Sequence, residues 1–242
     1  MGLVERFYDP TINGPYDESK PSHTTFTTIV ESWSDDELED NDEYIQWLFP
    51  IPECPRRQHV EAPPLDPETR DAFHTRQELR DRMYRAWKRM MAFYGWNVVT
   101  GIDNISITPR QNFGIRAEET WLRWTDHNHL RISRIIRSMR ILGLYRQAQA
   151  MLSSIIQANN AAGWKVKPAI CVIWFDTAMR PTCYPSAYPR EPICGWLKGA
   201  GHEDGIEACE DYELEEGKSF RCDGREDEIS LEYSVYFPQR TW

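Results

Sequence analysis

Two sets of polar residues have the side-chain types and the spacing that chemistry requires. The first set is acidic and consists of Asp35, Asp36 and Glu39. Residues three or four positions apart share one face of a helix, and two carboxylates on one face can hold Mg²⁺ jointly with a substrate phosphate. The spacing therefore predicts a magnesium site. A purely structural interpretation competes with it, because Ser34 followed by acidic residues is also a usual helix start.

The second set consists of Asn128, His129 and Arg131. At about 100° per residue, Asn128 falls within about 20° of the centre of an apolar helical stripe, and the other two flank it. A buried Asn or Arg without partners costs on the order of 1–3 kcal/mol or more. One interpretation is a buried polar network that fixes helix register. The other makes all three catalytic residues that face a cavity. His127 points away, so we expect it to be exposed.

Residues 41–50, NDEYIQWLFP, supply candidate partners for that helix. Their apolar run 47–49 is too short for a membrane span and too apolar for a loop tip. We therefore expect it to pack on the helical stripe of Trp121, Ile132 and Met139. The acceptors for Asn128 and Arg131 would be Asp42, Glu43 or Gln46. Ligand contacts are predicted for Tyr44, Gln46, Trp47, Trp124 and Arg134.

Composition limits the classes of partner. The chain has 242 residues and a formal net charge of −10 at pH 7, which disfavours a protein that binds nucleic acid by neutralising phosphates. The sequence has no apolar run of 18 residues, and its first residues lack a basic region followed by an apolar core. We therefore expect no membrane insertion, no secretion, and a cytoplasmic or nuclear location. The oligomeric state is left open.

The six cysteines contain no closely spaced pair, which disfavours a structural zinc site. In a reducing compartment we expect thiols, although Cys209 and Cys222 flank an acidic loop and their pairing is left open. No motif of a covalent hydrolase, a zinc protease or a nucleotide-binding loop is present in the sequence. No cofactor is therefore expected, except that Mg²⁺ at the acidic residues stays open.

Hydrophobic periodicity predicts three long helices. They cover about residues 67–94, 116–142 and 144–160. The first should begin at an N-cap and first-turn proline, Asp66 and Pro67. The helices should end at three glycines, Gly95, Gly143 and Gly163.

After residue 163 the period changes. The apolar run 169–175, AICVIWF, predicts a buried strand, and the alternation over 228–237 predicts a half-exposed one. The expected fold class is α+β, with a mainly helical core and a small, irregular antiparallel β segment at the C-terminus. We expect a helical domain over 1–163 and a β-rich extension over 164–242 packed on it.

With the helices placed, several strings can be read together: FYDP near the start, Trp33 followed by DDELED, then DEYIQWLFP, MAFYG and TWLRWTDHNHLRISRIIRSMRILGL. Their order and gaps resemble the conserved N-terminal domain of the opioid growth factor receptor family over roughly residues 7–150. The resemblance implies a regulator, because the animal members are linked to binding an enkephalin peptide and to growth inhibition at the nucleus. This chain departs from the family pattern at His129, where the family usually has an aromatic residue.

Three functional hypotheses follow. The first is a small-molecule pocket protein, an enzyme that cyclises or isomerises a hydrophobic metabolite without a covalent nucleophile; the many aromatic residues suit such a pocket. The second is a non-catalytic peptide- or protein-binding regulator like the animal members. The third is a Mg²⁺-dependent enzyme on a diphosphate, because the acidic residues are superficially similar to the metal motif of class I terpene cyclases. Arg131 and Arg134 would then clamp the diphosphate.

Overall fold

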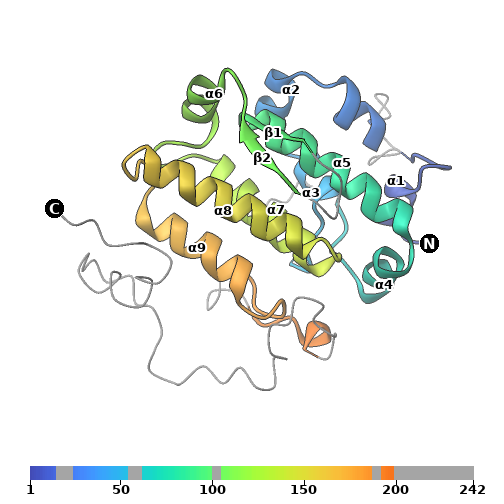
Figure 1. Ribbon diagram of the computed structural model, residues 1–242. Helices are drawn as coiled ribbons and strands as arrows, with labels where there is room; N and C mark the ends of the chain where they lie inside the picture. The colour runs from blue at the N-terminus through green and yellow to red at the C-terminus, as the bar shows by residue number, and fades with distance from the viewer. Residues whose placement is uncertain (15–23, 54–61, 100–104, 187–191, 199–242) are drawn as a thin grey trace, which may run out of the picture. The chain divides into compact units, whose positions relative to one another are not determined.

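The computed structural model describes residues 1–14, 24–53, 62–99, 105–186 and 192–198. Over these residues the chain is mainly helical with one small antiparallel sheet, which confirms the α+β class (Figure 1). The α-helices are α1 (Leu3–Tyr8), α2 (Asp35–Asp40), α3 (Tyr44–Leu48), α4 (Pro67–Thr75), α5 (Gln77–Phe93), α6 (Phe113–Thr120), α7 (Asn128–Ile141), α8 (Tyr145–Ala161) and α9 (Pro168–Met179). Shorter helical turns are η1 (Thr28–Ser32) and η2 (Gly195–Leu197).

Helix α7 lies at the centre of the packing and is buried on nearly all sides. Helices α8 and α9 both pack against it and against each other (Figure 1). Gly143 makes the tight connection from α7 to α8 with a φ of +86°, a conformation that side chains other than glycine rarely adopt. The third predicted helix is confirmed as α8, and it ends at Gly163, which also has a positive φ of 81°.

The first predicted helix, 67–94, has the expected ends but is two helices. Asp66 accepts a hydrogen bond from the backbone N–H of Thr69 (2.7 Å), and Gly95 ends α5 with a φ of +95°. Between α4 and α5 the backbone is extended at Arg76. The side chain of Arg76 pairs there with Asp9 (2.5 Å). No glycine or proline marks this break in the sequence, and the hydrophobic periodicity continues across it. The sequence therefore predicted a single helix.

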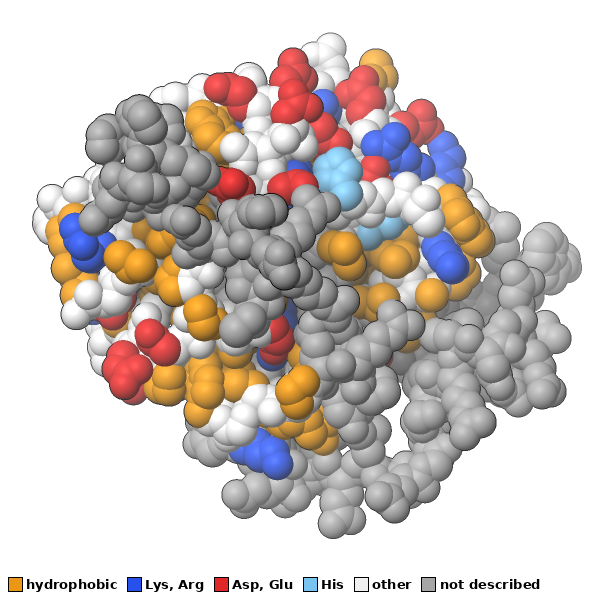
Figure 2. Space-filling model, turned by 180° about the vertical axis from the view of Figure 1, so that it is seen from behind, with side chains coloured by type: hydrophobic (Ala, Val, Ile, Leu, Met, Phe, Trp, Pro, Cys, Tyr) orange, Lys and Arg blue, Asp and Glu red, His pale blue; other side chains and the backbone are white. Residues whose placement is uncertain are grey.

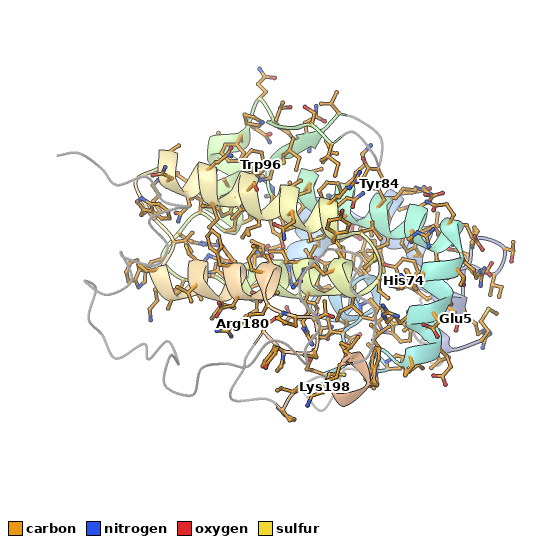
Figure 3. The ribbon with its side chains drawn as sticks, turned by 60° about the horizontal axis from the view of Figure 1, so that its bottom comes forward. Glu5, His74, Tyr84, Trp96, Arg180 and Lys198 are labelled. Atoms are coloured by element: carbon orange, nitrogen blue, oxygen red, sulfur yellow. The ribbon has the colours of Figure 1, made fainter. Side chains whose placement is uncertain are left out.

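The end of α4 is stabilised by side chains from other segments. Arg80 donates to the carbonyl oxygens of Phe73 and His74. His74 in turn lies 3.0 Å through its Nε2 from the carbonyl oxygen of Ile141, at the end of α7 (Figure 3). A carbonyl can only accept, so His74 donates. These bonds satisfy helix-end carbonyls and join α4 to α7.

The second predicted helix, 116–142, is also interrupted. Helix α6 ends at Thr120, and a seven-residue connection leads to α7. Trp121 donates from its indole N–H to the carbonyl oxygen of Tyr94 (3.1 Å), and Asp126 accepts from the backbone N–H of Asn128 (2.7 Å). Asp126 precedes the N-cap residue His127, and its carboxylate satisfies the first backbone N–H of α7. This start signal was in the sequence and was overlooked because the apolar spacing continued across it.

The predicted buried strand over 169–175 is wrong, because these residues form α9. Pro168 occupies the first turn, where its missing N–H costs nothing, and packing on α7 and α8 buries the helix. A short apolar run alone does not distinguish a buried strand from a buried helix. The sheet lies instead between α5 and α6, where β1 (Trp96–Val98) pairs with β2 (Ile107–Pro109) in the register Asn97 to Thr108. The predicted strand over 228–237 lies outside the described residues.

Residues Met1–Asp211 form one compact unit, to which α9 belongs. The domain boundary at residue 163 falls in the turn between α8 and α9 and stays a prediction. In the described part of the chain, no helix has the length and apolar character needed to cross a membrane.

Candidate functional site

The predicted polar residues meet where α7 adjoins α2, and a series of arginines organises that helix. Arg131, Arg134, Arg137 and Arg140 follow one another at intervals of three residues. Three residues turn an α-helix by about 300°, so each arginine is displaced by about 60° from the one before. Each of the four therefore reaches a different neighbouring segment, and each donates to at least one backbone carbonyl oxygen there.

Arg131 caps the C-terminal end of α2. Its guanidinium donates to the carbonyl oxygens of Leu38 (2.9 Å), Glu39 (3.3 Å) and Asn41 (2.9 Å). It also pairs with the Asp42 carboxylate at 2.9 Å, while its own side chain is 5% exposed. Of the three predicted acceptors, Asp42, Glu43 and Gln46, the one that pairs with Arg131 is Asp42. Because a helix end leaves carbonyls without intrahelical partners and carries negative charge, a buried guanidinium stabilises it.

Asn128 is fully buried and joins α2 to α7. Its amide nitrogen donates to the Glu39 carboxylate (3.1 Å), and its amide oxygen accepts from Arg131 (3.2 Å) and from the Tyr94 hydroxyl (3.5 Å). The acceptor for Asn128 is thus Glu39 rather than the predicted Asp42, Glu43 or Gln46. These contacts satisfy both ends of the amide with protein groups, as a register-fixing network requires.

His129 is 2% exposed and holds one tautomer. Its Nε2 donates to the carbonyl oxygen of Trp121 (2.7 Å), and its Nδ1 accepts from the backbone N–H of Asp126 (3.2 Å). The ring also meets Trp174 of α9 edge to face. Burial lowers the pKa of His129 below its usual value, although the hydrogen bond to Trp121 opposes this. Through these two hydrogen bonds, the imidazole ring of His129 links α7 to the connection between α6 and α7.

Arg137 and Arg140 are buried functional groups that the sequence interpretation missed. Arg137 pairs with both carboxylate oxygens of Glu53 (2.6 and 3.1 Å) and donates to the carbonyls of Thr182 and Tyr184. Arg140 donates to carbonyls at the end of α9. The sequence signal for their burial was the three-residue spacing of the arginines. Four arginines spaced in this way cannot all lie on one exposed face of a helix.

The predicted ligand-binding residues do not line one site. Tyr44 and Trp47 are buried; the Tyr44 hydroxyl contacts the sulfur of Met90, and the Trp47 ring lies 5.7 Å from that of Phe7. Arg134 donates to the carbonyl oxygen of Phe49 (3.0 Å). Gln46 is half-buried, and no hydrogen-bond partner for its side-chain oxygen is found in the described residues. Trp124, by contrast, is 57% exposed.

The predicted metal residues belong to a capped helix start. Ser34 and Glu37 form a reciprocal capping box at α2. Asp35 pairs with Arg89 (2.8 Å) and Arg116 (3.4 Å), Asp36 is exposed, and Glu39 contacts His127 (3.3 Å) as well as Asn128. His127 is exposed, as predicted. Within the described ranges, no group of three His, Cys, Asp or Glu side chains is arranged to hold a metal ion.

Two described cysteines, Cys171 and Cys194, are free thiols, as expected. Cys183 is disulfide-bonded, so the expectation of a thiol was wrong at this position. Cys209 and Cys222 lie outside the described residues.

A helical domain whose central helix anchors its neighbours through buried arginines is the class of protein that this geometry defines. Residues 6–163 match the family model of the opioid growth factor receptor (OGFr) conserved region, and the chain belongs to this family. The predicted family is therefore confirmed. No solved structure matches the chain.

Two relatives show the extent of the similarity. The chain is 38% identical over 129 residues to the opioid growth factor receptor of Homo sapiens, covering 51% of this chain and 18% of that protein. It is 33% identical over 145 residues to the opioid growth factor receptor-like protein 1 of Xenopus tropicalis, covering 59% and 27%. The chain thus spans about a fifth to a quarter of the length of these relatives.

Protonation of His129 gives a testable pH dependence. Its pKa in the folded chain is below the unfolded value of about 6.5. As the pH falls from that value toward the folded pKa, the unfolded chain takes up the proton first, so this contribution to stability is complete above about pH 6.5 and is lost below it. We expect His129→Gln to be less stable at pH 7 and to lose less stability than wild type between about pH 7 and pH 5.

Urea unfolding at several pH values measures this difference. Leu130→Gln is the control, because Leu130 is exposed, follows His129 directly on α7 and carries no titrating group. Its pH profile should parallel that of wild type. Parallel pH profiles for His129→Gln and wild type would contradict the lowered pKa of His129 in the folded chain.

Proposed function

We propose that the chain is a non-catalytic regulator that binds a short peptide or a peptide segment of a partner protein. The observation that carries the proposal is the saturation of Arg131, whose guanidinium donates to three backbone carbonyls, a carboxylate and Asn128. A catalytic or diphosphate-clamping arginine needs donors directed at a substrate, whereas these donors are directed at α2. Family membership supports the same conclusion, since a relative is named as a receptor for opioid growth factor.

The enzyme hypotheses receive no comparable support. The interpretation of Asn128 and His129 as catalytic requires side chains that face a cavity, but both are buried and bonded to protein groups. The diphosphate hypothesis requires Arg131 and Arg134 to be available, and both contact backbone carbonyls. Asn128 and Arg131 instead join α2 to α7, and His129 joins α7 to the connection that precedes it.

Calorimetric titration with an enkephalin peptide tests the proposal, because the family resemblance names that ligand class. We expect saturable binding of the peptide, no binding of a scrambled peptide of the same composition, and recovery of the peptide chemically unchanged by mass spectrometry. The control variant is Asn128→Asp, which keeps the shape of the side chain and places a charge beside Glu39. It should lose stability, while its folded fraction should bind with unchanged affinity.

Two results would contradict the proposal. One is peptide conversion that is abolished in a folded Asn128→Asp protein, which would make Asn128 catalytic. The other is an absence of peptide binding together with saturable stabilisation by a hydrophobic metabolite in a thermal-shift screen.

A further inference from the structure

Trp124 is a large apolar side chain held in an exposed position. It is 57% exposed, although its neighbours Trp121 and Leu122 are buried. Its carbonyl oxygen accepts from the backbone N–H of Lys167 (3.3 Å). The preceding residue, Arg123, donates to Asp126 (2.6 Å) and to the carbonyl of Glu119 (2.5 Å). The backbone on both sides is therefore fixed, so binding a partner would cost little ordering of this loop.

Near the start of α7 lie a second exposed apolar side chain and the apolar helix α9, whose N-cap residue Lys167 is bonded to Trp124. Leu130, in the first turn of α7, is 69% exposed. The indole N–H of Trp174 on α9 donates to the carbonyl oxygen of His129 (3.0 Å), which brings α9 to this turn. Helix α9 is apolar on all sides apart from Asp176 and Thr177, yet Ile170 and Ile173 stay half-buried. A helix that is apolar all round normally has every face covered.

Figure 2 shows one face of the molecule, on which hydrophobic side chains gather beside histidine side chains. We call the set Trp124, Leu130, Lys167, Ile170 and Ile173 the Trp124 surface. Exposed apolar side chains that gather on one face mark interaction sites more often than scattered apolar residues do.

Charge indicates what kind of partner the Trp124 surface fits. Arg123 is paired with Asp126, and Lys165 is paired with Glu118. Lys167 is exposed, and no carboxylate partner for its ammonium group is found in the described part of the chain. An unpaired cation at the edge of an apolar surface is complementary to an apolar side chain with a carboxylate close by.

We propose that the Trp124 surface is a docking site for an extended peptide segment that carries an aromatic or aliphatic side chain and a carboxylate within two residues of it. The apolar side chain packs between Trp124 and Leu130, and the carboxylate pairs with Lys167. This inference rests on the proposed function and adds the place and the chemistry of recognition.

A second copy of the chain fits this surface less well. In a two-fold dimer through the Trp124 surface, the same surface of each copy would meet the other. Such a dimer would place two Lys167 ammonium groups in one interface, and it would bring together two chains of net charge −10. Like charges across an interface oppose association. A short peptide with a carboxylate avoids the first disadvantage and carries less negative charge than a second chain does.

Selection from a random dodecapeptide library displayed on phage tests the proposal on the full chain. For wild type, we expect enriched peptides with Phe, Trp, Tyr, Leu or Ile next to Asp or Glu, and Trp124→Ala should weaken their binding about tenfold or more. Lys167→Glu should instead enrich Lys or Arg beside the apolar residue. Leu3→Ala is the matched control, because Leu3 is an exposed apolar residue on α1 (50%) and should leave binding unchanged.

The outcomes separate the two proposals. If enriched peptides bind Trp124→Ala and wild type equally, or if Lys167→Glu selects the same acidic peptides, the docking surface is wrong while peptide binding stands. If wild type enriches no peptide, the proposed function fails together with the surface. Concentration-dependent dimerisation that Trp124→Ala abolishes would assign the surface to a second copy and overturn the inference.

Discussion

Replacement of Arg137 by alanine is expected to destabilise the chain by about 3–5 kcal/mol, the range seen when one partner of a buried ion pair is removed. The Arg137 side chain is 3% exposed and that of Glu53 is 14% exposed. Without the guanidinium, the Glu53 carboxylate keeps its burial and loses its counter-charge. The carbonyl oxygens of Thr182 and Tyr184 lose their donor at the same time.

Urea unfolding of Arg137→Ala and wild type at neutral pH measures this loss. Cys183 lies between the two carbonyls and is disulfide-bonded, so both proteins are compared in the oxidised state. Arg85→Ala is the control, because the Arg85–Glu31 pair is about half exposed on both sides. Such surface pairs contribute about 0–1 kcal/mol. Equal losses in the two variants would refute the structural importance of the Arg137 contacts.

Arg137→Lys refines the same experiment. Lysine keeps the positive charge but cannot pair with both Glu53 oxygens while donating to two carbonyls, because it lacks the planar fork of donors. We expect an intermediate loss of stability. A lysine variant as stable as wild type would mean that charge alone suffices.

Replacement of Arg131 by methionine is the second large effect that we expect, with a loss of about 2–4 kcal/mol. Methionine fills part of the same volume but leaves the carbonyls of Leu38, Glu39 and Asn41 without their donor. Because these carbonyls belong to the end of α2, the loss should also be local. Hydrogen exchange should show faster exchange of the α2 amides than in wild type, with smaller changes in α8.

Asp42→Asn is the control for Arg131→Met. The Asp42 side chain is 50% exposed, so its ion pair with Arg131 should contribute less than about 1 kcal/mol. If Asp42→Asn were as destabilising as Arg131→Met, the ion pair and not the carbonyl contacts would hold α2. If α2 exchanged no faster in Arg131→Met, the capping role would be wrong.

Local signals in the sequence predicted helix starts and ends well. Asp66 caps α4 with its side chain three residues away, and Gly95 and Gly143 act through their own backbone, so a short window of sequence contains the whole cause. The pairing of Arg131 with Asp42 was also predictable, because a guanidinium on an apolar stripe needs an acceptor and the nearby acidic motif offered one. The choice of Glu39 as partner of Asn128 depended on the end of α2, which periodicity does not specify.

Other features depended on contacts between distant segments. The break between α4 and α5 is stabilised by Asp9 and Arg80, and the helical state of 169–175 by packing on α7 and α8. Neither cause lies within the affected window. The exposure of Trp124 also depended on distant segments. Tryptophan is usually buried, and the hydrogen bond that holds this loop comes from Lys167, 43 residues further along the chain.

The sequence by itself determined the family, the helical class and the acidic and basic residues that had to meet, because motif strings, periodicity and uncompensated polar groups are all written along the chain. The tertiary structure decided which of these polar and aromatic residues are bonded in the interior and which are exposed. It placed Asn128, His129 and Arg131 in a bonded interior and left Trp124 and Leu130 at the surface. The physical reason is that a polar group is available for a ligand only after the fold has assigned its hydrogen bonds, and those assignments join residues far apart in sequence.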